Sequence, residues 1–370
     1  MVVHPKIDLN AFEKDLDKIK DEVPKSIKDF HHIQKIERWG RLCSFVGYAT
    51  AFLIPNPVSA FLISQGNITR YTIINHHISH GALENIKGVP RRYTKKAFAQ
   101  GWRRYVDWFD WITPKAWHKE HNILHHYSLN ERFDPDLVEL TTAPLGKLKA
   151  PKIIKIIAIF LVASIWKPFY LAPSTTKQLY TPKKDVTNKK EADRLYWLDD
   201  TYSPFSSPGR ELWLKSYIPY SFFKFIIIPL LFLPIGLWAS INVLINVLLA
   251  EWITNLHSFL IIVTNHAGED LYRFNSKVKN KGEFYLRQIL GSTNYRTGSD
   301  LNDFLHGWLN YQIEHHVWPN LTPLQYKLLH PKLKKVCQKY KIPFVQESVW
   351  KRLVKTVNIC TSSTSMKKGN

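Results

Sequence analysis

The placement of the histidines constrains this chain more than any other feature of its sequence. Most of the sixteen histidines lie in three short segments: residues 75–81, 117–126 and 310–316. On a helix, residues four apart share a face, so His76 with His80 and His121 with His125 should each point in one direction. Several imidazoles that converge from separate segments are typical of a metal site.

The ligand types favour a histidine-rich di-iron site over a carboxylate-rich one. Two irons need about eight or more protein ligands, which no single helix supplies, so several segments have to converge. Carboxylate-rich di-iron sites use repeated Glu-x-x-His pairs on bundle helices. Glu120 and Glu314 lie inside two of the histidine segments, but neither belongs to such a repeated pair.

Two apolar stretches predict helical hairpins that cross a membrane. The first, about 42–75, turns at Pro55-Asn56-Pro57, and neither arm reaches about 20 clean apolar residues. The second, about 217–261, is the most hydrophobic part of the chain and is divided at Pro234 and Gly236. Residues 153–171 are also apolar, but lysines interrupt them, so we expect this stretch to lie in the membrane interface.

Charge supports a membrane protein with a large polar part. The net charge is +21, and the mean hydropathy of −0.22 is too polar for a chain buried wholly in lipid. Because no basic run is interleaved with aromatics, we expect an anionic membrane surface and no nucleic acid as the partner. Lysine and arginine crowd the loop 81–152, whereas both hairpin turns are uncharged. The positive-inside rule therefore places both termini and every histidine segment on the cytoplasmic side.

These patterns predict an all-α integral membrane protein. It should have four transmembrane helices in two hairpins and a cytoplasmic helical cap that holds the histidine-rich site. We expect an amphipathic cytoplasmic segment (1–41), a main domain (42–340) and a cytoplasmic tail (341–370). Within the main domain, the hairpins should lie at about 42–75 and 217–261, and the cap should consist of 76–216 and 262–340.

The cysteines and the two ends of the chain bear on its compartment. Cys43, Cys337 and Cys360 are far apart and form no disulfide framework, which indicates a reducing side. Residues 1–41 lack the apolar core of a cleavable signal peptide. Lys367 and Lys368 resemble a dilysine retrieval signal. We expect the endoplasmic reticulum membrane in a eukaryote and the cytoplasmic membrane in a bacterium.

At its histidine segments the chain resembles the membrane fatty-acid desaturase family. His76-x-x-x-His80-Gly matches the first histidine box, and His121-Asn-Ile-Leu-His125-His126 matches the second. The segment 307–319 (GWLNYQIEHHVWP) resembles the third box of front-end and acyl-lipid desaturases, in which glutamine replaces the first histidine. Residues 264–268 (TNHAG) resemble an Asn-His segment that follows the last membrane helix in the family. The resemblance covers about 70–340.

The resemblance implies two irons that use O₂ to introduce a cis double bond into a lipid acyl chain held in a kinked tunnel. It implies these iron ligands and catalytic histidines: His76, His80, His121, His125, His126, His266, His315 and His316. Gln312 stands where some relatives have a ligating histidine and is a ninth candidate, and Asn265 is a candidate to hold a water ligand. The acyl carrier is left open between acyl-CoA, a phospholipid and a sphingolipid base. No His-Pro-Gly-Gly haem motif is present, so the expected electron donor is a separate cytochrome b-type protein or ferredoxin.

The other histidines receive structural interpretations. His77 stands where relatives often have Asp and is expected to orient a ligand, and Asp134 or Asp136 is a candidate to accept a histidine N–H. His118 and His306 are expected beside the site, and His257 is expected to be buried and hydrogen-bonded. The remaining histidines weighed here are expected at the surface: His31, His32 and His330.

Three alternatives remain open from the sequence. A hydroxylase can use the same di-iron scaffold, because the histidine boxes do not separate oxygen insertion from a second hydrogen abstraction. A non-enzymatic membrane protein that binds metal or lipid could use the same scaffold, but the intact boxes argue against it. A cation transporter would need histidines in mid-membrane, whereas these lie at or beyond the ends of the predicted helices.

Overall fold

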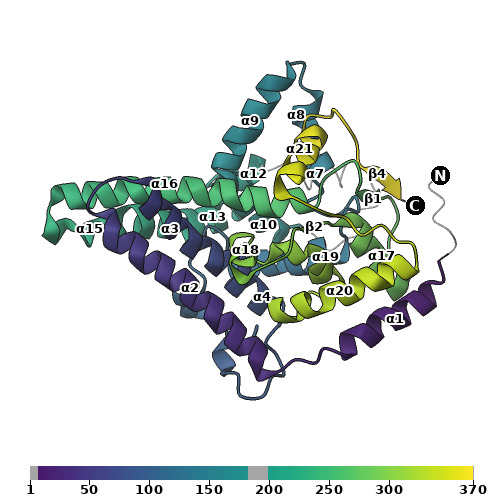
Figure 1. Cartoon of the computed structure of the whole chain (residues 1–370). Helices are drawn as coiled ribbons and strands as arrows, with labels where there is room; N and C mark the ends of the chain where they lie inside the picture. The colour runs from purple at the N-terminus through teal and green to yellow at the C-terminus, as the bar shows by residue number, and fades with distance from the viewer. Residues whose placement is uncertain (1–6, 182–198, 370) are drawn as a thin grey trace.

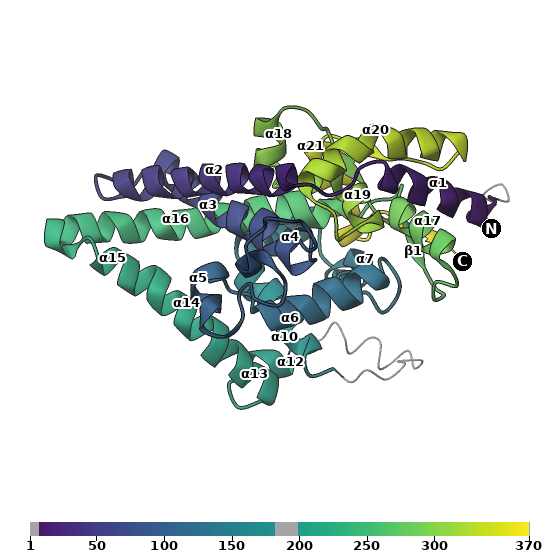
Figure 2. The same ribbon diagram turned by 90° about the horizontal axis from the view of Figure 1, so that it is seen from below.

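The computed structural model describes residues 7–181 and 199–369, and most of these residues are helical, as predicted. Within the described ranges, the strands form two short parallel pairs: β1 (Tyr272–Phe274) with β4 (Lys367–Gly369), and β2 (Asn294–Tyr295) with β3 (Gln346–Glu347). Figures 1 and 2 show long helices that extend to one side as an arm, and shorter helices gathered into a body.

The arm contains α2 (Ile27–Ala51), α3 (Pro57–Ile68) and two helical runs that meet at Gly236. The helices α2 and α3 approach closely because glycines lie between them: a Cβ on Gly66 would be 1.8 Å from the Ser44 Oγ. The turn between them is stabilised by α16 (Leu237–Ile262), on which the Asn246 amide donates to the carbonyl oxygens of Ala51 and Ile54.

The first helical run alternates between α- and π-helical turns. Its parts are α13 (Ser207–Leu212), η6 (Trp213–Tyr217), α14 (Ile218–Phe222), η7 (Phe223–Ile227), α15 (Ile228–Leu230) and η8 (Leu233–Ile235). The π-helical turns come just before Pro219 and Pro229, whose missing N–H groups interrupt the α-helical ladder. The second run is α16 (Leu237–Ile262) followed by η9 (Val263–Asn265).

In the described ranges, these two runs, Ser207–Ile235 and Leu237–Asn265, are long and apolar enough to cross a membrane. They match the predicted hairpin at 217–261, although its first helix begins earlier, at Ser207. A third candidate is the pair formed by α9 (Lys152–Ser164) and a helix made of η5 (Lys167–Leu171) and α10 (Ala172–Gln178), which is bent by 85° at the break. The helices of the predicted first hairpin are not apolar enough to be counted with them, because α2 is charged in its first half and the run that begins with α3 contains Gln65, Asn67 and Arg70.

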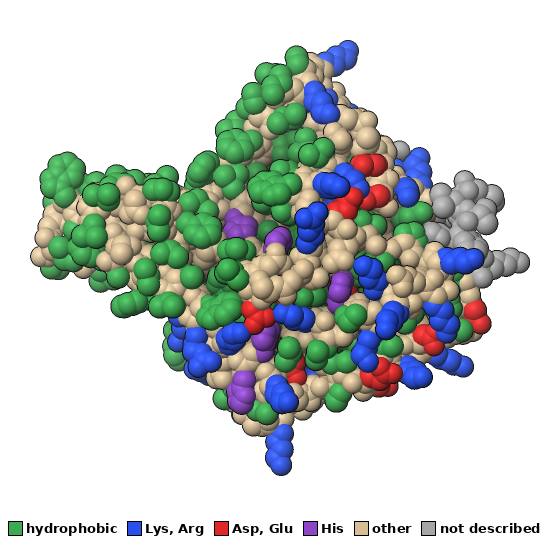
Figure 3. All heavy atoms as spheres, in the orientation of Figure 1, with side chains coloured by type: hydrophobic (Ala, Val, Ile, Leu, Met, Phe, Trp, Pro, Cys, Tyr) green, Lys and Arg blue, Asp and Glu red, His purple; other side chains and the backbone are tan. Residues whose placement is uncertain are grey.

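Apolar side chains cover the arm and α9, whereas lysine, arginine and carboxylate side chains gather on the body (Figure 3). At the far end of the arm, the side chains of Trp238 and Leu231 are 75% and 68% exposed. On α9, Ile153 and Leu161 are 60% and 59% exposed. Exposed apolar surface on this scale marks a membrane or protein interface.

The body includes both ends of the described chain. The helix α1 (Leu9–Asp21) buries Phe12 and Leu16 against α17 (Lys281–Gly291) and α20 (Pro323–Lys339), so its apolar face is covered by protein. The expected boundary at residue 41 falls inside α2. The expected tail 341–370 contributes α21 (Val349–Cys360), with Ile359 and Cys360 buried, and it ends in β4.

The remaining short elements include those that carry the histidine segments. They are η1 (Thr69–Asn75), α4 (His76–Ser79), η2 (Arg91–Tyr93), η3 (Gly101–Arg103), α5 (Arg104–Asp107), α6 (Pro114–Trp117), η4 (His118–His125), α7 (Val138–Thr141), α8 (Ala143–Lys147), α12 (Asp199–Tyr202), α18 (Asp300–Leu305), η10 (Leu309–Tyr311) and α19 (Gln312–Val317).

Candidate metal centre

The structure brings all eight predicted histidines together in two groups. The five-histidine group contains His76, His80, His121, His126 and His315. The three-histidine group contains His125, His266 and His316. In each group, the nitrogen atoms that can act as ligands all lie within 4.8 Å of one another.

A π-helical turn decides which histidines of the second segment face each group. The prediction that His121 and His125 share a face agrees with the stacking of their rings, whose centroids are 5.4 Å apart. The two histidines nevertheless belong to different groups, because η4 is π-helical and residues five apart align there. His121 therefore joins His126 in the five-histidine group, with their Nε2 atoms 3.2 Å apart. His125 is directed to the three-histidine group, where its ring centroid lies 4.9 Å from that of His266.

The third segment also serves both groups. On α19, the adjacent His315 and His316 point to the five- and three-histidine groups respectively. The turn before this segment contains Gly307, where a Cβ would lie 2.6 Å from the Thr72 Oγ1 of η1. Glycine thus permits the third segment to approach the helix that carries His76.

His266 follows η9 at the end of the second membrane-spanning candidate. Its Nε2 lies 3.0 Å from the Gln312 Nε2, so the ninth predicted ligand is beside the three-histidine group. The Gln312 Oε1 and the Asn265 Oδ1 are buried and have no hydrogen-bond partner among the described residues. Both oxygens are thus available to a ligand or a water molecule.

The donor set fits two metal ions. The His76 and His121 Nε2 atoms are 3.0 Å apart, a separation at which both could contact one ion. The Nε2 atoms of His80, His315 and His316 are buried and have no hydrogen-bond partner in the described ranges. Such buried nitrogens need a partner, and a shared metal ion provides one.

Burial also sets the protonation state that metal binding requires. It lowers the pKa of seven of these histidines well below the ordinary value: His76, His80, His121, His126, His266, His315 and His316. Neutral imidazole is the form that ligates iron. For His125, burial also acts to lower the pKa, but the Asp134 carboxylate and its hydrogen bond outweigh burial and raise the pKa.

Outer hydrogen bonds orient several of the rings. The Nδ1 of His125 lies 2.9 Å from the Asp134 carboxylate, and the Nδ1 of His316 lies 3.0 Å from the Gln288 Oε1. The Nδ1 of His315 lies 3.2 Å from the Tyr326 hydroxyl. With Nδ1 held, each Nε2 is free to face the centre.

The sequence suggested Asp134 but neither Gln288 nor Tyr326. Both residues lie outside the histidine segments, Gln288 on α17 and Tyr326 on α20, although Tyr326 follows His316 by only ten residues. At Gln288, the available signal for a role at the site was its polar side chain on a buried helical face, about one turn after Tyr285.

Most histidines outside the two groups have structural partners. The His77 Nδ1 lies 2.9 Å from the Ile73 carbonyl, and burial lowers the pKa of His77 to about 4. His257 is hydrogen-bonded to the Leu305 carbonyl, as expected, but it is half-buried and not buried. His330 was expected at the surface, but it lies 2.8 Å from the Glu314 carboxylate, because α20 packs over the third segment. His118 and His306 contact Asn122 and the Asn302 carbonyl, outside both groups.

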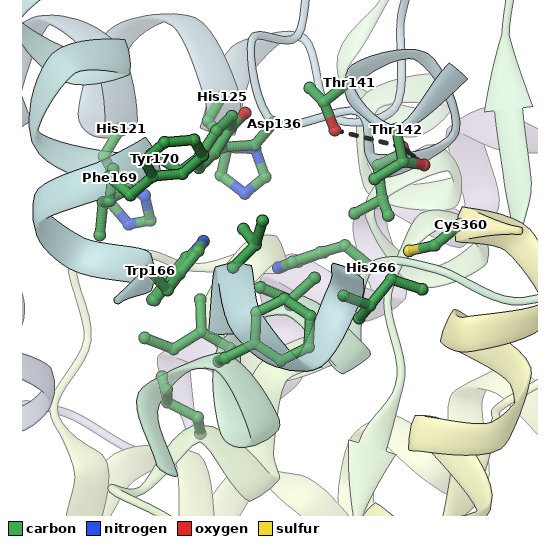
Figure 4. A pocket seen from close by; sticks show the side chains of 18 of the residues that line it. His121, His125, Asp136, Thr141, Thr142, Trp166, Phe169, Tyr170, His266 and Cys360 are labelled. Atoms are coloured by element: carbon green, nitrogen blue, oxygen red, sulfur yellow. Dashed lines mark hydrogen bonds between the residues drawn. The ribbon is translucent and has the colours of Figure 1, made fainter. Parts of the chain in front are cut away.

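A largely apolar cavity of about 310 Å³ borders both groups (Figure 4). His121, His125 and His266 line it at the metal centre, and Figure 4 shows these rings turned toward its interior. The rest of the wall is mainly apolar side chains from α9, η5, α16 and the α7–α8 region. The arrangement suits an alkyl chain held against two metal ions, in an enclosure of the size used for small ligands.

Comparison with known proteins agrees with this geometry. A family model described as fatty acid desaturase matches residues 51–348. The chain belongs to the fatty acid desaturase family. The resemblance inferred from the histidine segments is thereby confirmed.

The desaturase chain is similar over short segments to several characterised relatives. Over 111 residues it is 32% identical to an NADPH-dependent stearoyl-CoA 9-desaturase of Mycobacterium tuberculosis, and the aligned segment covers 27% of this chain and 26% of that protein. It is 34% identical over 85 residues to the Delta(6)-fatty-acid desaturase fat-3 of Caenorhabditis elegans, covering 23% and 18%. It is 28% identical over 130 residues to an acyl-lipid (8-3)-desaturase of Mortierella alpina, covering 34% and 28%. These matches span between about a fifth and just over a quarter of each relative. The search of solved structures gave no match.

Proposed function

We propose that this chain is an O₂-dependent membrane desaturase that introduces a cis double bond into a lipid acyl chain at a di-iron centre. The observation that carries the proposal is the apolar cavity, whose lining includes histidines from both groups. An alkyl chain there has a methylene beside the metal centre and apolar contacts along the rest of its length.

In this proposal the eight histidines hold two irons, and Gln312 contacts the second iron directly or through water. When bound, the irons supply the O₂ activation and hydrogen abstraction that protein side chains cannot perform. The chain's own residues orient the substrate and exclude water. Ile159 and Val162 on α9 and Phe259 on α16 form apolar walls that hold the alkyl chain in one register. Electrons come from a separate donor, a cytochrome b-type protein or a ferredoxin.

We also propose that α2 and α3 form a first membrane hairpin beside α16, which gives four crossings with the body on the cytoplasmic side. The support is the packing of both helices along α16 and the exposed apolar residues Phe45, Leu53 and Val58. The proposal places the protein in the endoplasmic reticulum of a eukaryote or the cytoplasmic membrane of a bacterium. A membrane-impermeant maleimide should label Leu53→Cys and Lys87→Cys from opposite sides. Labelling of both from one side would contradict the hairpin.

The activity is tested by expression in a host with a simple lipid profile, followed by mass-spectrometric location of double bonds. We expect a new unsaturated acyl chain that His125→Ala abolishes and His31→Ala retains, since His31 is exposed on α2 and distant from the centre along the chain. A product that has gained oxygen would favour the hydroxylase alternative. Formation of the same product by His125→Ala would contradict the proposed site.

A further inference from the structure

A second cavity of about 310 Å³ lies against η1, on the side away from the proposed acyl cavity. The two cavities have no lining residue in common. Arg70 and Ile74 of η1 line the second cavity, whereas Tyr71 and Thr72 of the same turn line the first. The other walls of the second cavity come from α2 and from the loop between the first two histidine segments.

This second cavity is rich in guanidinium groups. Its charged lining residues are Arg41, Arg70, Arg92 and Arg103, with Glu37 and Asp107 as the carboxylates. Both carboxylates already have partners. Asp107 accepts two hydrogen bonds from Arg103, of 2.9 and 2.7 Å, and Glu37 pairs with Arg41 at 2.5 Å.

Two guanidinium groups are left without a carboxylate. Arg92 donates to the Tyr93 hydroxyl at 2.7 Å and has no carboxylate partner in the described ranges. Arg70 has no side-chain hydrogen bond or ion pair there. Guanidinium groups present paired N–H donors that match the oxygens of a phosphate, so the cavity has the chemistry of a phosphate site.

The cavity lies where the charged part of α2 gives way to its apolar part. Leu42 and Phe45, just after Arg41, are 58% and 72% exposed. On the opposite wall, Val106 is 61% exposed and follows Arg103 by three residues. Figure 2 shows α5, which contains Val106, at the end of the arm nearest the body. A cationic cavity flanked by exposed apolar side chains is typical of the headgroup level of a bilayer.

We propose that this second cavity binds the phosphate group of an anionic membrane phospholipid, whose acyl chains lie along the exposed apolar face of α2. The inference rests on the proposed membrane placement of the arm, but not on the desaturase reaction. An acidic donor protein is the less suitable ligand, because the charges line a concavity between helices that fits a headgroup.

The test uses the purified full-length chain in nanodiscs of phosphatidylcholine, with and without phosphatidylglycerol. Native mass spectrometry measures the lipid retained, and thermal unfolding measures stabilisation. We expect one retained phosphatidylglycerol and a higher unfolding temperature in its presence. Arg70→Ala/Arg92→Ala should lose about tenfold or more in lipid affinity, because two charge-assisted contacts are removed. Arg70→Lys keeps the charge but not the paired donors and should lose less.

Arg38→Ala is the matched control, because Arg38 is an exposed arginine of α2 that does not line the cavity. It should retain lipid as the wild type does. Equal retention by the double variant would overturn the proposal, as would equal stabilisation by inorganic phosphate, which would assign the cavity to a free anion. A raised KM for an acidic electron donor, with unchanged lipid retention, would overturn it in favour of donor binding. Lipid retention does not depend on acyl product formation. The absence of an acyl product would therefore contradict the proposed reaction without contradicting the lipid site.

Discussion

The five-histidine and three-histidine groups share the helices η4 and α19 but differ in how their ligands are supported. The outer contacts found in the five-histidine group are neutral: His76 with the Thr72 carbonyl and His315 with the Tyr326 hydroxyl. In the three-histidine group, His125 contacts the Asp134 carboxylate and His316 contacts a glutamine. We therefore expect metal binding by the smaller group to be more sensitive to the loss of one histidine or of one outer partner.

The largest expected effect comes from removing one ligand of the smaller group. His316→Ala leaves two histidines there and should lower product formation by more than about 100-fold. His80→Ala leaves four histidines in the larger group and should lower it less. Product formation per folded chain measures both. Equal losses in the two variants would contradict the unequal dependence.

A smaller effect is expected from the outer partners. Asp134→Asn replaces the charged acceptor of the His125 Nδ1 and should lower iron affinity or activity about 10- to 100-fold. Tyr326→Phe removes a neutral contact of 3.2 Å to His315 and should cost less than about tenfold. Iron titration into the apo chain compares the two variants. A greater loss in Tyr326→Phe would reverse the proposed order of support.

The third expected effect concerns Gln312. Gln312→Ala removes a side chain that lies 3.0 Å from His266 but belongs to neither histidine group. We expect a loss of about tenfold or less in activity, since the three histidines remain. Gln312→Asn shortens the side chain but keeps the amide, and serves as the matched variant. A loss as large as that of His316→Ala would make Gln312 an essential ligand.

The smallest effect expected is a pH dependence of the stability of the apo chain. For the seven histidines with lowered pKa, the unfolded chain takes up protons below pH about 6.5 while the folded chain does not. The contribution of these seven histidines to the free energy of unfolding should be fully present above that pH. It should decrease as the pH falls toward their lowered pKa values in the folded chain. His125 has a raised pKa and should act in the opposite sense, with stability lost as pH rises. Chemical unfolding of the apo chain between pH 5 and 8 measures the net result, and stability that rises on acidification would contradict it.

The sequence was sufficient for the histidine segments and the hairpin at 217–261, because motif spacing and apolar length are local properties. It was insufficient for the allocation of ligands, since the helical period assumed for His121 and His125 does not hold in the π-helical η4. Gln288 and the covered faces of α1 and α21 depend on contacts between distant segments. Such contacts leave little trace in a single sequence.

The metal content of the purified wild-type chain tests the central claim most directly, because both groups have to be filled for the cavity to serve a di-iron reaction. Inductively coupled plasma mass spectrometry gives the iron-to-protein ratio. The two groups predict about two irons per chain in the wild type and about one in His316→Ala. A wild-type ratio of about one or lower, after iron has been supplied to the apo chain, would contradict the account.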